Sequence, residues 1–110
     1  MLIVRNNIIP LKSYKAMSAW PFIFVREEAE VDAVTLLHEE IHGRQQKELL
    51  IVFFFLWYGM EWLIRLAAYR NAHKAYRMVS FEQEAYIHED NADYLSIRKH
   101  YAWIRYIFFK

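Results

Sequence analysis

Glycine and proline are scarce in this chain, and their scarcity restricts its fold more than any other feature. Only two glycines and two prolines occur in 110 residues, whereas ordinary usage is about 7% glycine and about 5% proline. Both prolines, Pro10 and Pro21, lie near the N-terminus, so no proline interrupts the 89 residues that follow. Because proline breaks helices and glycine is typical of turns, the sequence predicts a chain made mostly of long helices.

The N-terminal segment has a different pattern. Short apolar runs at residues 2–4, 8–9 and 22–25 alternate with Asn6-Asn7 and the two prolines. This pattern predicts two or three short strands, of which Phe22–Val25 is the strongest because its residues are β-branched or aromatic. The length is typical of one domain. We therefore expect a single domain over residues 1–110 with an α+β fold, mainly helical, with a small N-terminal β-sheet.

The composition excludes several classes of protein. There is no cysteine, which excludes a disulfide scaffold, a zinc ribbon and a cysteine nucleophile, so a metal site has to use histidines and carboxylates. The net charge of +1 argues against a dedicated nucleic-acid binder, and we expect no nucleic-acid partner. The first residues lack the basic stretch and apolar region of a signal peptide, so we expect a cytoplasmic location.

Residues His38-Glu39-Glu40-Ile41-His42 form an HExxH motif. The apolar spacing predicts a helix here, beginning near Val31 with Asp32 as its N-cap and ending at about Leu49. Two histidines four residues apart on a helix point the same way and can bind one zinc ion. Glu39 lies about 100° around the helix from His38, where it can take a proton from a zinc-bound water.

A catalytic zinc needs a third protein ligand. Glu82 is favoured because Ser80-Phe-Glu-Gln83 fits a capping box, which places Glu82 in a first helical turn where the helix dipole favours an ionised carboxylate. We expect this helix to continue to near the C-terminus. Glu84 stays an alternative, but it points about 160° away from Glu82 on that helix, so the two cannot both face the metal. The weaker candidates are His73, His88 and Glu89.

The HEEIH motif and the later segment Phe81-Glu-Gln-Glu-Ala-Tyr86 together resemble the gluzincins, zinc metallopeptidases that combine HExxH with a downstream glutamate in an ExxA motif. The resemblance extends to Ile23–Arg26, to the Gln45-Gln46 pair and to Trp57–Leu63. It implies a minimal metallopeptidase with a zincin-like fold, in which an active-site helix and a glutamate helix hold the metal.

The same resemblance implies roles for individual residues. His38, His42 and Glu82 would bind Zn²⁺, Glu39 would be the general base, and the substrate would be a peptide or protein. In enzymes of this type an edge strand before the active-site helix aligns the substrate by main-chain pairing, which here indicates Ile23, Phe24 and Val25.

This chain departs from the gluzincin pattern at Tyr86. Many gluzincins have an acidic residue four positions after the ligand glutamate, where it orients a zinc-binding histidine. With a tyrosine there, either another residue supplies that hydrogen bond or the site is tuned differently. Tyr86 itself is expected either to donate to the oxyanion, as a catalytic residue, or to pack in the core.

The run Leu49–Met60 has twelve residues without a charge. A bilayer span needs about 20 apolar residues, so this run is more typical of a buried core helix, with contact to a membrane as the alternative. The alternative leads to a rival function for the chain. It would be a non-catalytic or membrane-docked metal-binding module that contacts a membrane surface or a partner protein through Leu49–Trp57.

Overall fold

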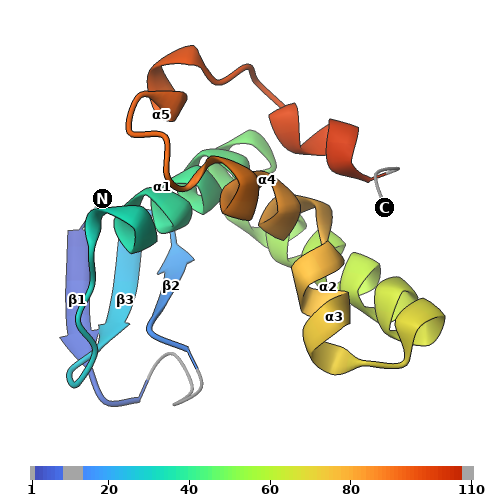
Figure 1. The fold of residues 1–110 in the computed structure, drawn as a ribbon, viewed down its shortest axis with the longest axis horizontal. Helices are drawn as coiled ribbons and strands as arrows, with labels where there is room; N and C mark the ends of the chain where they lie inside the picture. Colours follow the sequence, from blue (N-terminus) through green and yellow to red (C-terminus); the bar gives the residue numbers. More distant parts are fainter. Residues whose placement is uncertain (1, 9–13, 108–110) are drawn as a thin grey trace.

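The N-terminal part of the chain forms a three-stranded sheet, and helices follow it to the C-terminal end (Figure 1). The structure is a computed structural model that describes residues 2–8 and 14–107. It confirms the expected α+β class with mostly helical content. Ile9 and Pro10, which entered the prediction of the N-terminal strands, lie outside the described residues.

The sheet contains β1 (Leu2–Asn6), β2 (Ala16–Ala19) and β3 (Phe22–Arg26), in the spatial order β1-β3-β2. β1 runs parallel to β3, and β2 pairs with β3 as an antiparallel hairpin. The predicted strand at 22–25 is confirmed. It is the central strand, with a neighbour on each side, so it has no free edge.

The helix that carries HExxH is α1 (Ala33–Glu48), and the Asp32 side chain accepts a hydrogen bond from the Thr35 N–H as its cap. α2 (Leu50–Tyr69) follows with no loop between them. The chain turns at Leu50, whose φ of 53° is in the left-handed region that glycine usually occupies. The predicted end of this helix at about Leu49 is confirmed, although no glycine or proline there indicated that the chain would turn in this way.

The remaining elements are α3 (Ala72–Met78), α4 (Ser80–His88), α5 (Tyr94–Ile97) and a 3-10 helix (Ala102–Tyr106). The expectation that the helix beginning at Ser80 continues to near the C-terminus is wrong, because α4 ends at His88. The short segments after α4 fold back over α1 and α4 (Figure 1).

Two clusters of buried apolar side chains hold the helices together, and α4 contributes to both. Leu37 and Ile41 of α1 pack with Ala85 of α4 and with Tyr94. The second cluster joins α2, α4 and the 3-10 helix; its buried members are Phe54, Val79, Phe81 and Trp103. The rings of Phe54 and Phe81 stack with centroids 4.4 Å apart. α4 is therefore fixed between α1 and α2.

α2 is not the buried core helix that the uncharged run 49–60 predicted. It is 20 residues long, and only Phe54 and Glu61 along it are buried. Within the described ranges it is the one helix whose length and composition would allow it to cross a membrane, a criterion that core helices of soluble proteins also meet. One side of α2 packs on the protein, and the other side is exposed and apolar.

Glu61 of α2 anchors the start of α4. Its buried carboxylate accepts hydrogen bonds of 2.6 Å from both the backbone N–H and the hydroxyl of Ser80, and a third from the indole N–H of Trp57. Arg65, four residues further along α2, forms an ion pair with the same carboxylate. The predicted capping box is wrong: the Ser80 hydroxyl binds Glu61 instead of capping its own helix, and Val79 is the N-cap residue.

Replacing Glu61 by alanine should therefore destabilise the protein by about 3 kcal/mol, because the buried N–H and hydroxyl of Ser80 lose their acceptor and Arg65 loses its ion-pair partner. Glu61→Gln keeps the volume and one acceptor and should cost less. Urea unfolding of the purified variants measures both effects. Glu27→Ala, which removes an exposed glutamate, is the matched control and should leave the free energy of unfolding nearly unchanged. Equal stability of Glu61→Ala and this control would contradict the anchoring role.

Candidate metal centre

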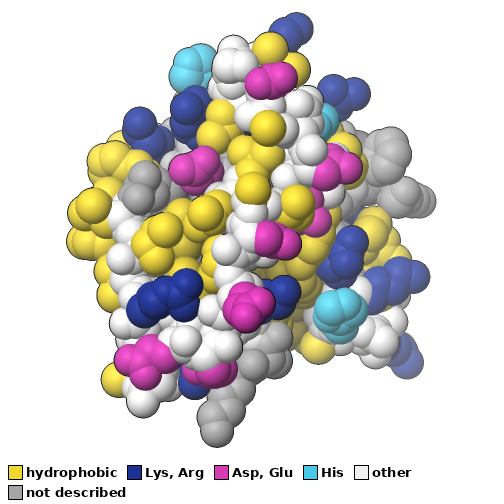
Figure 2. All heavy atoms as spheres, turned by 60° about the vertical axis from the view of Figure 1, so that its left-hand side comes forward, with side chains coloured by type: hydrophobic (Ala, Val, Ile, Leu, Met, Phe, Trp, Pro, Cys, Tyr) yellow, Lys and Arg dark blue, Asp and Glu magenta, His cyan; other side chains and the backbone are white. Residues whose placement is uncertain are grey.

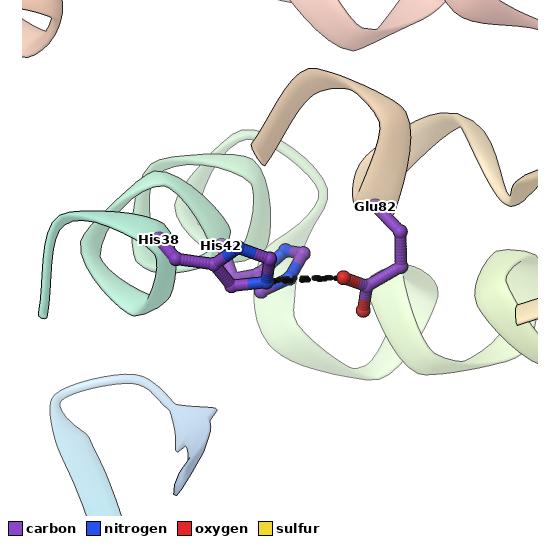
Figure 3. A group of neighbouring side chains, drawn as sticks. All are labelled: His38, His42 and Glu82. Atoms are coloured by element: carbon purple, nitrogen blue, oxygen red, sulfur yellow. Dashed lines mark hydrogen bonds and ion pairs between the residues drawn. The ribbon is translucent and has the colours of Figure 1, made fainter. Parts of the chain in front are cut away.

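His38 and His42 lie one turn apart on α1, and both are buried. Their Nε2 atoms are 3.2 Å apart and face the same point (Figure 3). The i, i+4 spacing on an uninterrupted helix produces this arrangement, as the sequence predicted.

Glu82 supplies the third donor atom from α4. Its Oε1 lies 3.1 Å from the Nε2 atoms of both His38 and His42 (Figure 3). The residue is in the first turn of α4, where the sequence placed it. Burial raises the pKa of its carboxyl, but the charge of His42 and the hydrogen bonds of both histidines outweigh this and hold the pKa well below its usual range. The group is therefore an ionised carboxylate.

The other nitrogen of each ring is held by a separate acceptor. His38 Nδ1 lies 2.6 Å from the carboxylate of Glu89, which can only accept, so Nδ1 carries the proton. His42 Nδ1 lies 2.7 Å from Oε1 of Gln45. The Gln45 amide nitrogen donates to the Phe81 carbonyl and the Glu84 carboxylate, which fixes its oxygen toward His42. When the rings are neutral, as they must be to bind a metal, both imidazoles are thereby set as Nδ1–H tautomers.

This choice of tautomer leaves three electron-rich atoms facing one another. The two Nε2 atoms and Oε1 of Glu82 lie within 3.2 Å of one another. Since the proton of each neutral ring is on Nδ1, each Nε2 has a free lone pair that faces the carboxylate oxygen. A divalent cation satisfies all three, and bonds of 2.0–2.2 Å in a tetrahedral site give ligand atoms about 3.3–3.6 Å apart. His38, His42 and Glu82 are the one group of this kind in the described part of the chain, and they could hold a metal ion.

Without a metal, a proton has to take the cation's place. Burial lowers the pKa of His42, but the adjacent Glu82 carboxylate outweighs burial and raises that pKa to about 9. The same negative charge that would attract a metal ion thus stabilises an imidazolium ion in its absence.

Glu39 is buried beside the histidines. Burial raises the pKa of its carboxyl, which the charges of His42 and His38 partly oppose. The residue lines a cavity of about 650 Å³ together with His42 and Glu82, so the donor atoms border open space on this side. The rest of the lining is largely apolar and comes from β2, α2 and α3.

Two tyrosines at the site had no signal in the sequence. Tyr58 of α2 donates a hydrogen bond of 2.7 Å to Oε2 of Glu82, the carboxylate oxygen that does not face the histidines. Tyr76 of α3 lines the cavity. Tyr58 lies in the uncharged run 49–60 and Tyr76 lies between basic residues in α3, so neither segment indicated a site, and only the fold brings the two side chains to the metal centre.

The structure also places the other residues that the sequence singled out. Tyr86 packs edge-on against His38 and shares a hydrogen bond of 2.9 Å with the Tyr76 hydroxyl; its catalytic role stays a prediction. His88 stacks on Tyr94, away from the three donor atoms, and His73 lies on the cavity wall. Glu89 is not one of the three converging groups. Its carboxylate accepts the hydrogen bond from His38 Nδ1 instead.

Glu84, the alternative third ligand, belongs to a different network of hydrogen bonds and ion pairs. It is fully buried and pairs with Arg98, which also binds Glu48 through two hydrogen bonds of 2.9 and 3.0 Å. The Tyr94 hydroxyl donates to the same carboxylate. Of the two glutamates, Glu82 is therefore the one that faces the histidines.

The topology of the sheet corrects the prediction that the strand at 22–25 is an edge strand that aligns a substrate. Ile23, Phe24 and Val25 belong to β3, whose two edges are occupied by β1 and β2, so β3 cannot pair with a further extended chain. The edge strand beside the cavity is β2, and Ala16, Met17 and Ser18 contribute to the cavity lining.

No known family, curated protein or solved structure matches this chain. The metal centre therefore rests on the geometry of its side chains alone.

Glu89→Gln should weaken binding of a divalent metal by about 10- to 100-fold, because His38 loses the carboxylate that sets its tautomer and raises its basicity. Competition with a chromophoric chelator measures the affinity. Asp90→Asn, at the exposed neighbouring residue, is the matched control and should bind as the parent protein does. Equal affinities in the two variants would show that Glu89 does not orient the ligand.

Proposed function

We propose that this protein is a zinc-dependent metallopeptidase, in which His38, His42 and Glu82 hold the zinc ion and Glu39 is the general base. The observation that carries the proposal is the open side of the metal centre. Structural zinc sites are closed by four protein ligands, whereas catalytic sites have three and keep one position for water or substrate. Here three donors converge, and a cavity adjoins them.

The donor set favours zinc among the common divalent ions. Two imidazole nitrogens and one carboxylate oxygen form a ligand set of hydrolytic zinc enzymes, whereas magnesium and calcium prefer oxygen ligands alone. When bound, zinc would lower the pKa of a coordinated water to about 7 and polarise the carbonyl of a scissile amide.

A side chain of the protein would transfer the proton between the attacking water and the leaving amine. Glu39 is buried next to the donor atoms and borders the cavity, and its raised pKa suits a group that accepts a proton and later delivers it to the leaving amine. Tyr58 holds the second oxygen of Glu82, which leaves Oε1 to act as a single-point ligand.

The free edge of β2 beside the cavity supports an extended peptide as substrate. The outer edge of β2 borders it, and an added strand would gain main-chain hydrogen bonds there. The Gln46 side chain of α1 donates to the Ser18 carbonyl and accepts from the Trp20 N–H. These backbone groups at the Trp20 end of the β2 edge are therefore not free to pair with a substrate. A substrate strand would therefore pair toward Ala16, and the apolar walls would receive large apolar side chains.

Glu39→Gln tests this function. The variant should bind zinc as the parent protein does, while zinc-dependent cleavage of unfolded casein falls by about 100- to 10,000-fold, the range of general acid–base catalysis. Glu40→Gln removes a carboxylate from the next position on α1 and is the matched control. It should retain activity.

Each outcome distinguishes the candidate functions. Full activity of Glu39→Gln would contradict the assigned base. A parent protein that binds zinc tightly but cleaves neither casein nor a peptide library would favour the rival function, a metal-binding module without catalysis. Failure to bind zinc would remove the basis of both.

A further inference from the structure

The outer side of α2 is a continuous apolar surface, which we call the α2 outer face and define as Leu50, Val52, Phe53, Leu56, Met60, Leu63 and Ile64. All seven side chains are exposed, six of them by 58 to 71%. They recur at the three- and four-residue spacing of one helical side and include no charged group. Leu50 and Ile64 are 14 residues apart on this helix, so the face extends for about 21 Å.

The inner side of α2 is tied to the protein by polar contacts along its length. Tyr58 binds Glu82, Glu61 binds Ser80, and Arg65 donates to the Ile107 carbonyl. A helix that crossed a bilayer would carry these groups and the helices packed on them into hydrocarbon, where ionised groups are costly. An apolar helix with one side bound in this way suits a position lying along a lipid surface.

The exposed charges that flank α2 along the chain are of one sign. Between Glu48 and Glu82 the only acidic residue is Glu61, which is buried. Exposed cations follow the C-terminal end of α2: Arg70, Lys74 and Arg77. At the other end Lys47 lies over the ring of Trp20, much as Lys74 lies over the ring of Tyr69. Aromatic rings and cations at the borders of an apolar surface are typical of membrane interfaces.

This charge pattern distinguishes a lipid surface from a second copy of the chain. Two copies joined through the α2 outer face would bring cations toward cations, with no exposed acid on α2 or α3 to pair with them. Anionic lipid headgroups complement the same cations. The face that carries the sheet differs, because acidic and basic side chains lie among its hydrophobic ones (Figure 2).

We propose that the α2 outer face docks this protein on the surface of an anionic lipid bilayer, with α2 lying in the plane of the interface. The inference goes beyond the proposed function and does not depend on it. Docking would also bring the cavity beside the lipid, since Phe55 and Gly59 of α2 are exposed and line that cavity.

Flotation of the full chain with lipid vesicles tests the proposal. The protein should float with vesicles of phosphatidylcholine mixed with phosphatidylglycerol, and bind at least about tenfold more weakly to phosphatidylcholine alone or at high salt. Phe53→Glu combined with Leu56→Glu should reduce binding at least about tenfold. Ile87→Glu combined with Ile97→Glu changes two similarly exposed apolar residues outside α2 and should bind as the parent protein does.

Two further measurements make each result decisive. Thermal unfolding and zinc affinity of the α2 variant should match those of the parent protein, because the altered side chains are exposed; zinc affinity also separates loss of docking from loss of the metal centre. Sedimentation equilibrium reports self-association. Absence of flotation would overturn the proposal, whether the protein is then monomeric or is a dimer that Phe53→Glu with Leu56→Glu dissociates. Equal loss of binding in both double variants would overturn it as well.

Discussion

The mutual repulsion of three electron-rich atoms is the constraint on which this structure depends. Glu89 and Gln45 hold the Nδ1 protons of His38 and His42, so both Nε2 lone pairs point at the Glu82 carboxylate. Such a cluster is unfavourable unless a positive charge lies within it. The folded protein therefore carries a built-in requirement for a cation, which a metal ion meets with three bonds and a proton meets only in part. Folding and metal binding are coupled in such a site, because a bound cation stabilises the arrangement that the side chains impose.

Holding that arrangement is the task of α2 and α4. The two histidines come from one helix and need only its periodicity, but the glutamate comes from another and needs a fixed position relative to the first. That position is set at several points: Glu61 binds the first residue of α4, Phe54 stacks on Phe81, and Gln45 binds the Phe81 carbonyl. Tyr58 then fixes the far oxygen of Glu82. One side of the apolar helix α2 thus supplies a hydrogen bond to the site, while its other side is exposed.

The sequence by itself determined the parts of this protein that depend on local geometry. Helical content follows from the scarcity of proline, and Asp32 caps the helix that it was expected to cap. His38 and His42 face one point because four residues are close to one helical turn. Glu82 lies in a first turn, as expected, although the neighbouring Ser80 does not form the capping box that suggested it. Each of these features is decided within about four residues of chain, where spacing and residue type are sufficient.

Only the tertiary structure decided the features that join distant segments. Glu89 lies 51 residues from His38, and Tyr58 lies 24 residues from Glu82, so no periodicity relates them. The strand at 22–25 was recognisable, but its central place depends on β1 pairing with it in parallel from the other side. The exposure of α2 likewise depends on a left-handed turn at Leu50, a residue type that rarely adopts this backbone. Apolar composition indicates that a segment tends to be buried, whereas the arrangement of all the helices decides which of its sides is buried.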